Sequence, residues 1–234
     1  MKITHNGLEI TKYEHDTIVV TSAQLGITVA FDPFQSQGTF RNDHKADIIF
    51  ISHDHFDHFS PKDLQSLTSK HTVFAFPASI LDKVQTFLDV DPKRLIPVVP
   101  LEEYKITANK STISAMAVPA YNIDKRSPQG NLYHAKDREY VGFVVDIGGT
   151  GVYFVGDSDP IPEMDALVGM VEVLLLPISG VYVMTIDEAV TIALKLQPRI
   201  VIPLHYGVVV GEAEMGEQFR KALAEVAPNI IVAL

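Results

Sequence analysis

Three of the chain's nine histidines fall within six residues, interleaved with aspartates, directly after an apolar run that predicts a buried strand. The segment reads Ser52-His53-Asp54-His55-Phe56-Asp57-His58, and the strand predicted before it spans 47–51, with its apolar run over 48–51. Histidine nitrogens and carboxylate oxygens are ligands for zinc, manganese, iron and nickel. Because ligands bind at the carboxyl ends of strands in α/β folds, the segment predicts a metal site.

The directions of these side chains depend on where the strand ends. In an extended chain His53, His55 and Asp57 lie on one face and His58 on the other. A turn into a helix near Asp57 would instead bring His58 back, so that two adjacent metal ions share the segment. The competing interpretation is a solvated polar loop, which this density of ligand residues disfavours.

Two other predicted strands also end in residues that can bind a metal ion. One runs into Gly156-Asp157-Ser158, and another runs into His205-Tyr206-Gly207. Asp32 follows a strand over 27–31 and is expected in a turn or behind the metal ligands. Each residue alone has a structural explanation. Together they favour a convergent site, because several strands can deliver ligands to one sheet edge.

The elements that position these residues alternate between strands and helices. Strands are predicted over 18–20, 27–31, 47–51, 72–76, 112–118, 140–147, 152–155, 171–176, 200–202 and 230–232, and helices over 60–70, 78–88, 185–196 and 211–226. Ser60-Pro61 predicts a helix start, and Thr185-Ile186-Asp187-Glu188 a capping box. No linker rich in Gly, Ser or Pro divides the chain. The pattern predicts one α/β domain over residues 1–234, built from two similar halves.

Composition narrows the classes of function. Of 234 residues, 47% are hydrophobic and 21% charged, as in proteins that bury a sizeable core. The formal net charge of −10 disfavours a polynucleotide partner. The absence of cysteine excludes thiolate ligands, disulfides and a cysteine nucleophile. No apolar run is long enough for a membrane span and the first residues turn polar too early for a signal peptide, so a cytoplasmic location is expected.

Two segments have more than one interpretation. Residues 122–139 form the most polar irregular stretch, which predicts a solvated loop, with a substrate-facing loop as the alternative. The apolar Val208-Val209-Val210 segment predicts core residues. A pocket wall or a contact in a homo-oligomer is the alternative there.

At these positions the sequence resembles the metallo-β-lactamase-fold hydrolases, in particular the small stand-alone branch of sugar-lactonase-like and phospholipase-D-like metal-dependent hydrolases. His53-x-His55-x-Asp57-His58 matches the superfamily's HxHxDH signature at every position. Gly156-Asp157-Ser158 matches the place of its bridging aspartate, and Leu204-His205-Tyr206 that of its last histidine. The order and spacing extend over most of the chain. The resemblance implies an αββα four-layer sandwich with a site for two divalent ions at one edge of its sheets.

The resemblance also implies a ligand set. One ion would take His53, His55 and a third histidine, and Asp157 would bridge it to an ion held by Asp57, His58 and His205. Asn122 stands where the third histidine is expected, so the first site would be weak, completed by water, or empty. His134 would replace that ligand, or would belong to substrate binding.

Two carboxylates are expected behind the ligands. Asp32 would support them, and Asp54 would do so by reaching the far nitrogen of a ligand histidine. The remaining histidines match nothing in the pattern and are expected to be ordinary surface or core residues: His5, His15, His44 and His71.

The implied chemistry is hydrolysis of a small molecule by a metal-bound hydroxide. Two divalent ions, zinc first with manganese, iron or nickel as alternatives, lower the pKa of a water molecule between them. Asp57 would hold that water or accept its proton, and a basic residue of the 122–139 loop would hold an anionic substrate. The bond would be an ester, lactone, amide or phosphodiester. The alternative is a non-catalytic metal-binding or ligand-sensing module on the same fold.

Overall fold

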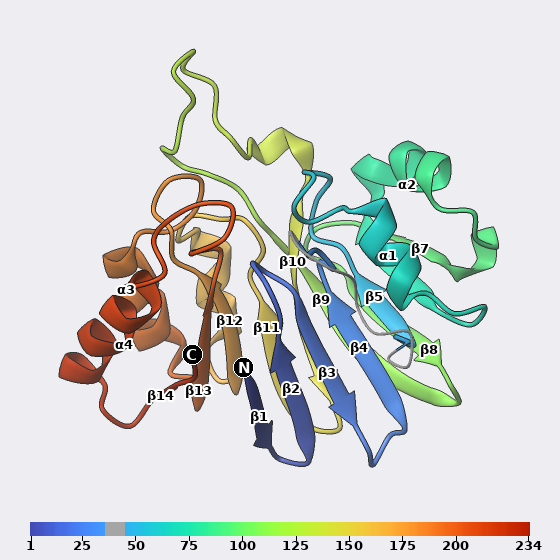
Figure 1. The fold of residues 1–234 in the computed structure, drawn as a ribbon, viewed down its shortest axis with the longest axis horizontal. Coiled ribbons are helices and arrows are strands. Elements are labelled where there is room, and N and C mark those ends of the chain that lie inside the picture. Colours follow the sequence, from blue (N-terminus) through green and yellow to red (C-terminus); the bar gives the residue numbers. More distant parts are fainter. Residues whose placement is uncertain (36–44) are drawn as a thin grey trace.

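The computed structural model describes residues 1–35 and 45–234 and contains two seven-stranded sheets with helices outside them (Figure 1). The first sheet comprises β1 (Lys2–His5), β2 (Leu8–Lys12), β3 (Ile18–Ser22), β4 (Ile27–Phe31), β5 (Ile48–Phe50), β6 (Val73–Pro77) and β7 (Leu95–Val98). The second comprises β8 (Glu103–Ala108), β9 (Ser111–Pro119), β10 (Val141–Ile147), β11 (Thr150–Phe154), β12 (Val173–Pro177), β13 (Ile200–Leu204) and β14 (Ile231–Val232).

The helices follow the parallel strands. They are α1 (Pro61–Leu67), α2 (Leu81–Phe87), α3 (Ile186–Leu196) and α4 (Met215–Val226), with short 3₁₀ helices at Ala78–Ile80, Pro92–Arg94, Lys136–Arg138 and Pro162–Leu167. The capping box of α3 is confirmed: the Thr185 side chain accepts from the Glu188 amide, and the Glu188 side chain accepts from the Thr185 amide. The predicted start of α1 is confirmed, with Ser60 at the N-cap position and Pro61 as the first helical residue, although the Ser60 hydroxyl donates to the Asp63 side chain rather than accepting from a backbone amide.

Both sheets change from antiparallel to parallel pairing at their fourth strand along the chain. Strands β1 to β4 pair antiparallel and β4 to β7 parallel. Likewise β8 to β11 pair antiparallel and β11 to β14 parallel. The parallel strands β5, β12 and β13 are buried at every residue, as expected for strands covered on both faces. Their carboxyl ends deliver the polar residues considered below.

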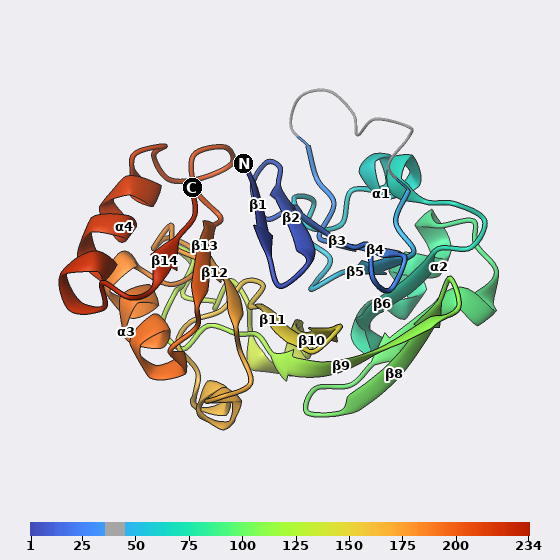
Figure 2. The same cartoon turned by 90° about the horizontal axis from the view of Figure 1, so that it is seen from below.

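Three apolar clusters fill the spaces between four layers, which confirms the predicted αββα sandwich (Figure 2). Between the sheets, Phe31 stacks on Phe154 with ring centroids 5.1 Å apart. Leu64 of α1 and Val84 of α2 pack on the outer face of the first sheet. Ile192 of α3 and its neighbour α4 cover the second sheet.

Four strands were not predicted: β1, β2, β7 and β8. Each includes exposed or half-buried residues, so its apolar pattern is incomplete. Helix α4 begins at Met215, later than the predicted residue 211. Among the described residues, none of the helices combines the length and hydropathy needed to cross a membrane.

Candidate metal centre

The motif segment leaves β5 and turns back on itself. The amides of His58 and Phe59 both donate to the carbonyl of His55, at 3.1 and 2.7 Å. This tight turn returns His58 toward His53, and their ring centroids lie 4.0 Å apart. Of the two arrangements open from the sequence, the structure therefore has the one in which a turn brings His58 back.

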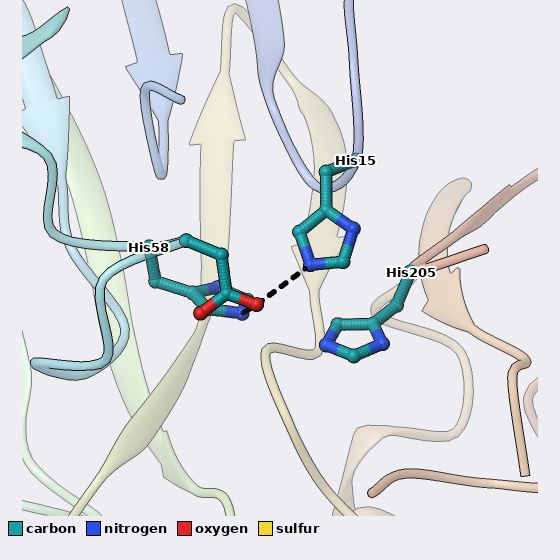
Figure 3. A group of neighbouring side chains, drawn as sticks. His15, His58 and His205 are labelled. Atoms are coloured by element: carbon teal, nitrogen blue, oxygen red, sulfur yellow. Dashed lines mark hydrogen bonds and ion pairs between the residues drawn. The ribbon is translucent and has the colours of Figure 1, made fainter. Parts of the chain in front are cut away.

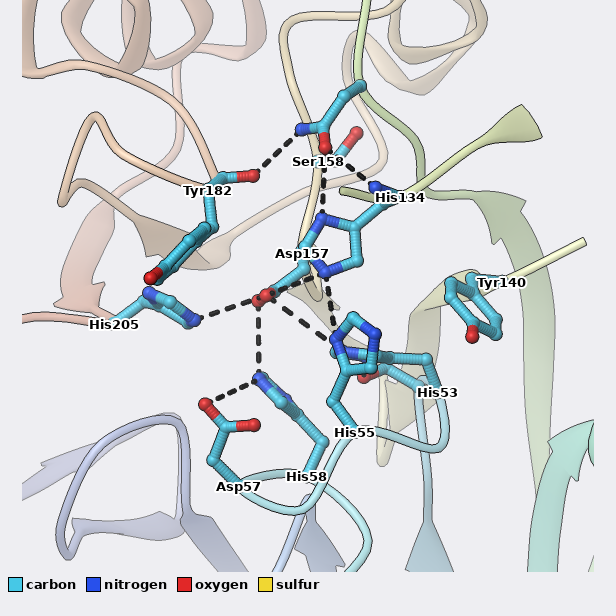
Figure 4. Close-up of polar contacts among 12 residues, drawn as sticks. His53, His55, Asp57, His58, His134, Tyr140, Asp157, Ser158, Tyr182 and His205 are labelled. Carbon is cyan, nitrogen blue, oxygen red and sulfur yellow. Dashed lines mark hydrogen bonds and ion pairs between the residues drawn. The ribbon is translucent and has the colours of Figure 1, made fainter. Parts of the chain in front are cut away.

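The first ligand group consists of His53, His55 and His134 (Figure 4). His55 Nδ1 lies 3.1 Å from His53 Nε2 and 3.2 Å from His134 Nε2. Ligands of a tetrahedral zinc ion at bond lengths near 2.0–2.1 Å are roughly 3.3 Å apart. The three nitrogens therefore have the mutual spacing that one metal ion requires.

The second ligand group consists of Asp57, His58 and His205, and Asp157 lies between the two groups (Figure 4). Asp157 Oδ2 is 3.1 Å from His205 Nε2 and 3.2 Å from His134 Nε2. Asp157 Oδ1 is 3.4 Å from His58 Nε2, and Asp57 Oδ2 is 3.9 Å from the same nitrogen. One carboxylate thus faces nitrogens of both groups.

Hydrogen bonds from behind fix which ring nitrogen faces the centre. His58 Nδ1 donates to Asp32 Oδ2 at 2.7 Å, which leaves the lone pair of Nε2 available. Ser52 donates its hydroxyl proton to Asp32, so His53 Nδ1 donates to Ser52 Oγ at 2.9 Å and again leaves Nε2 free. Asp32 therefore lies behind His58, the position considered for it from the sequence.

His134, rather than Asn122, stands beside the other histidines. Asn122 Oδ1 accepts from the His134 amide at 2.8 Å and lies 3.1 Å from His134 Nδ1, while Asn122 Nδ2 donates to the Tyr182 carbonyl at 2.8 Å. The amide group is thus used to hold His134. With Nδ1 donating to Asn122, the Nε2 lone pair of His134 points to His55 and Asp157. Part of the 122–139 loop therefore faces the centre.

Asp54 does not hold a ligand histidine, which corrects the prediction. Its carboxylate accepts from the Tyr140 hydroxyl at 2.6 Å and from Lys83 Nζ at 3.0 Å. The Tyr140 ring packs near His53, with centroids 5.1 Å apart, so Asp54 acts on the motif only through this ring. The turn that brings His58 back toward His53 places Asp54 on the opposite side of the segment, where it faces Lys83 of α2.

His15 and Asp16 were missed by sequence reasoning. His15 is buried, as a core histidine would be, but its Nε2 lies 3.1 Å from Asp57 Oδ2 and its ring packs on His205 at 4.2 Å (Figure 3). Asp16 Oδ2 is 3.9 Å from His58 Nδ1. Both residues occupy the turn between β2 and β3, a place where a lone histidine and aspartate carry no ligand pattern. Of the other unassigned histidines, His44 falls outside the described residues.

Unpartnered polar atoms at the centre fit bound cations. Among the described residues, His58 Nε2, Asp157 Oδ1 and both oxygens of Asp16 are buried without a hydrogen-bond partner. Four buried carboxyl groups converge here: Asp16, Asp32, Asp57 and Asp157. Buried charges need compensation, and two divalent ions would supply it. The donor set, all imidazole and carboxylate, also suits first-row metals.

The carboxylates and burial also set the pKa values. Burial holds the pKa of His53 well below its usual value, so this ring is neutral, as a ligand must be. Burial would also lower the pKa of His58, but Asp157 and Asp32 outweigh it and raise that pKa well above its usual value. Burial raises the pKa of Asp57, yet the hydrogen bond from His15 and the charge of His58 bring it down to about 2. The region thus attracts positive charge.

The backbone is unusual where it positions these groups. Gly156 has φ +67°, and a Cβ there would lie 3.0 Å from Ser52 Cβ, so only glycine lets the Asp157 turn approach the motif strand. Three non-glycine residues of the centre also have positive φ: His15, Asp32 and His205. Such conformations cost on the order of 1–3 kcal/mol each and tend to occur at functional sites.

A cavity of about 420 Å³ opens over the centre. Its wall contains ligand-group residues together with Phe56, Tyr133, Tyr182 and Val209. Val208 and Val209 are 44% and 37% exposed, so the prediction that this segment belongs to the core is wrong and the pocket-wall alternative applies to Val209. The cavity is large enough for a small molecule and gives it access to both ligand groups.

Comparison with known proteins agrees with this geometry. Residues 9–205 match the family described as "Beta-lactamase superfamily domain". The chain is 30% identical over 183 residues to the UPF0173 metal-dependent hydrolase of Archaeoglobus fulgidus, covering 76% of this chain and 74% of that protein. A crystal structure of a metal-dependent hydrolase from Parabacteroides distasonis matches with TM-score 0.75 and 26% identity, over 100% of this chain and 96% of the other.

A second solved structure shows the fold at lower identity. Igni18, a metallo hydrolase from Ignicoccus hospitalis, matches with TM-score 0.75 and 22% identity, over 97% of this chain and 94% of that one. The family match, the relative in Archaeoglobus and the paired sheets agree with the HxHxDH signature. The chain therefore belongs to the metallo-β-lactamase-fold superfamily, among the metal-dependent hydrolases of the UPF0173 type.

Proposed function

We propose that this protein is a hydrolase that uses two divalent metal ions, with zinc as the first candidate. His53, His55 and His134 would hold one ion, and Asp57, His58 and His205 the other, with Asp157 shared. The observation that carries the proposal is the position of Asp157, whose carboxylate lies within 3.4 Å of nitrogens from both ligand groups. A shared carboxylate is what a two-ion site needs.

The ions would lower the pKa of a water molecule so that it can attack at neutral pH. The residues of the chain then have separate tasks. Asp57, with a pKa lowered to about 2, is ionised at neutral pH but is a weak proton acceptor. Its task is therefore to orient the attacking water by accepting a hydrogen bond, while His15 holds the carboxylate in place. The bond cleaved would be an ester, lactone, amide or phosphodiester of a small molecule.

The test begins with metal content on protein purified without chelators or a histidine tag. We expect about two ions per chain, and hydrolysis of a generic ester or phosphodiester that chelation abolishes and zinc or manganese restores. Asp57→Ala should abolish turnover while the circular dichroism spectrum is unchanged. His71→Ala, which replaces an exposed histidine remote from the centre, is the matched control and should keep full activity. Turnover by Asp57→Ala equal to that of the wild type would refute the assignment.

The competing proposal is a non-catalytic metal-binding or ligand-sensing module. An asparagine at position 122, where a ligand histidine is expected, favours such a module, because loss of a ligand weakens a metal site. The position of His134 beside His55 argues against it, since His134 can supply the missing ligand. In such a module metal removal would lower the melting temperature with no activity to lose. Metal-loaded protein that binds two ions but hydrolyses no ester, lactone, amide or phosphodiester would favour it.

A further inference from the structure

The wall of the cavity over the ligand groups is apolar outside the groups themselves. Four residues form it, each from a different segment: Phe56 of the motif, Tyr133 of the 122–139 loop, Tyr182 before α3, and Val209 after β13. The Tyr133 and Tyr182 rings meet edge to face with centroids 4.7 Å apart. Tyr182 also lies edge-on to His205, with ring centroids 6.4 Å apart (Figure 4). The aromatic wall thus begins beside the second ligand group.

Some wall residues and their neighbours in the sequence are exposed apolar side chains. Phe56 is 68% exposed, and the valines next to the wall residues in sequence, Val181 and Val208, are also exposed. Single exposed apolar residues are ordinary, but a group of them around one concave site marks a binding surface. At about 420 Å³, the cavity suits a small ligand.

The basic residues of the neighbouring loop do not enter this cavity. Lys125 is held by Asp159 at 3.2 Å and Glu188 at 2.8 Å, and Lys136 by Glu163 at 2.8 Å. Arg126 and Arg138 line a neighbouring cavity of about 460 Å³, which shares His55 and Tyr133 with this one. Among the residues that the structure describes, the nine that line the cavity over the ligand groups thus include no lysine or arginine.

We propose that the substrate carries an uncharged, apolar group next to the bond that is cleaved, and that this group lies against Tyr133, Tyr182 and Val209. The inference rests on the proposed two-ion hydrolase, because the ligand groups form the floor of the same cavity. The physical reason is desolvation. A charged group in this cavity would lose water and gain no counter-charge from the wall, whereas an aliphatic or aromatic group gains from burial of its surface.

Hydroxamic acids test the inference, because they chelate metal ions without needing turnover. Three would be titrated calorimetrically into zinc-loaded protein: acetohydroxamic, hexanohydroxamic and adipic monohydroxamic acid. The last two differ only in a carboxylate that replaces the terminal methyl group. We expect hexanohydroxamic acid to bind at least about tenfold more tightly than acetohydroxamic acid. The hexanoyl chain has four more methylene groups, and their complete burial would give a larger gain in affinity than this. Adipic monohydroxamic acid should bind about as weakly as the acetyl compound.

Wall variants sharpen the test. Tyr182→Ala should reduce the preference for the hexanoyl over the acetyl compound, since it removes the aromatic surface but keeps the carbonyl that Asn122 uses. Val209→Lys should reverse the order of the hexanoyl and adipoyl compounds by supplying the missing counter-charge. Val226→Lys is the matched control: this valine is 56% exposed at the end of α4, and its replacement should leave all three affinities unchanged.

The outcomes separate this inference from the proposed function. If the hydroxamic acids bind in the expected order but no substrate is hydrolysed, the apolar cavity stands and the hydrolase assignment fails. If all three bind equally, or the adipoyl compound binds best to the wild type, the apolar-group inference is overturned while the metal centre stands. Loss of all binding in zinc-loaded protein would overturn both. A Val209→Lys variant that changes only the oligomeric mass, with the order of affinities intact, would assign the apolar surface to a subunit contact.

Discussion

The two ligand groups of the centre are built differently. The second group, Asp57, His58 and His205, is buried. Each member is held from behind by His15, Asp32 or Ser179, whose Oγ lies 3.2 Å from His205 Nδ1. In the first group His55 is partly exposed and His134 depends on a loop. Because supporting hydrogen bonds preorganise ligands, the second group should bind its ion more tightly. The affinity of each group for a metal ion therefore depends on the residues that hold its ligands as well as on the ligands themselves.

The largest expected effect comes from deleting one histidine from each group. His134→Ala should lose one ion and keep the other tightly, whereas His205→Ala should leave only a weakly held ion that desalting removes. Turnover should fall at least about a hundredfold in both, the upper end of what loss of a supporting residue costs. Metal content before and after desalting checks this. Equal retention in the two variants would contradict the difference between the groups.

A smaller effect is expected from the residue that holds His134. Asn122→Ala removes the acceptor of the His134 contacts, so the affinity for the weaker ion should fall by about 10–100-fold while the tighter ion is unaffected. Competition with a chromophoric chelator measures the two affinities separately. Asn131→Ala, an exposed asparagine of the same loop, is the control and should change neither affinity.

The corresponding change in the second group is at His15. His15→Leu keeps the buried volume but removes the nitrogen that contacts Asp57, so the tighter ion should lose about tenfold in affinity and turnover should fall. His15→Gln, which retains a donor, should restore part of both. A His15→Leu variant that lowers the affinity of the first ligand group, and not that of the second, would contradict the proposed difference between the two groups.

The remaining effect, on stability rather than on metal binding, concerns pH and a lysine near the second group. Lys12 Nζ donates to the Pro203 carbonyl at 2.7 Å and lies 4.2 Å over the Tyr206 ring. Burial lowers its pKa from 10.5 to about 8, although Asp16 opposes the shift. Between these two values the unfolded chain binds a proton that the folded chain does not, so the free energy of unfolding rises with pH in this window and is constant below it.

Urea unfolding of the chelated protein at pH 7.5, 9 and 10 measures this rise. In Lys12→Met the rise should be absent, because the titrating group is gone. Lys2→Met removes an exposed lysine that pairs with Glu9 and serves as the control, in which the rise should persist. Unfolding free energies that change equally with pH in the wild type and in Lys12→Met would contradict a half-buried, destabilised ammonium.

Much of the fold was predictable because buried strands and amphipathic helices carry strong local patterns. Strands β4, β5, β12 and β13 and helix α3 follow such patterns closely. The edge strands β1 and β8 do not, because an exposed face interrupts their alternation. The signature residues of the centre were found for a similar reason, since ligands that follow buried strands in one segment form a recognisable cluster.

The amino-acid sequence by itself determined the superfamily, the αββα sandwich and six candidate ligands, namely Asp157 and the five residues that lie around it. Only the tertiary structure decided between Asn122 and His134, placed His15 and Asp16 at the centre, and removed Asp54 from it. These choices depend on which segments of loop and turn meet at the sheet edge. These tertiary contacts join residues that are far apart in the chain, such as His15 and Asp57, and no local sequence pattern predicts such contacts.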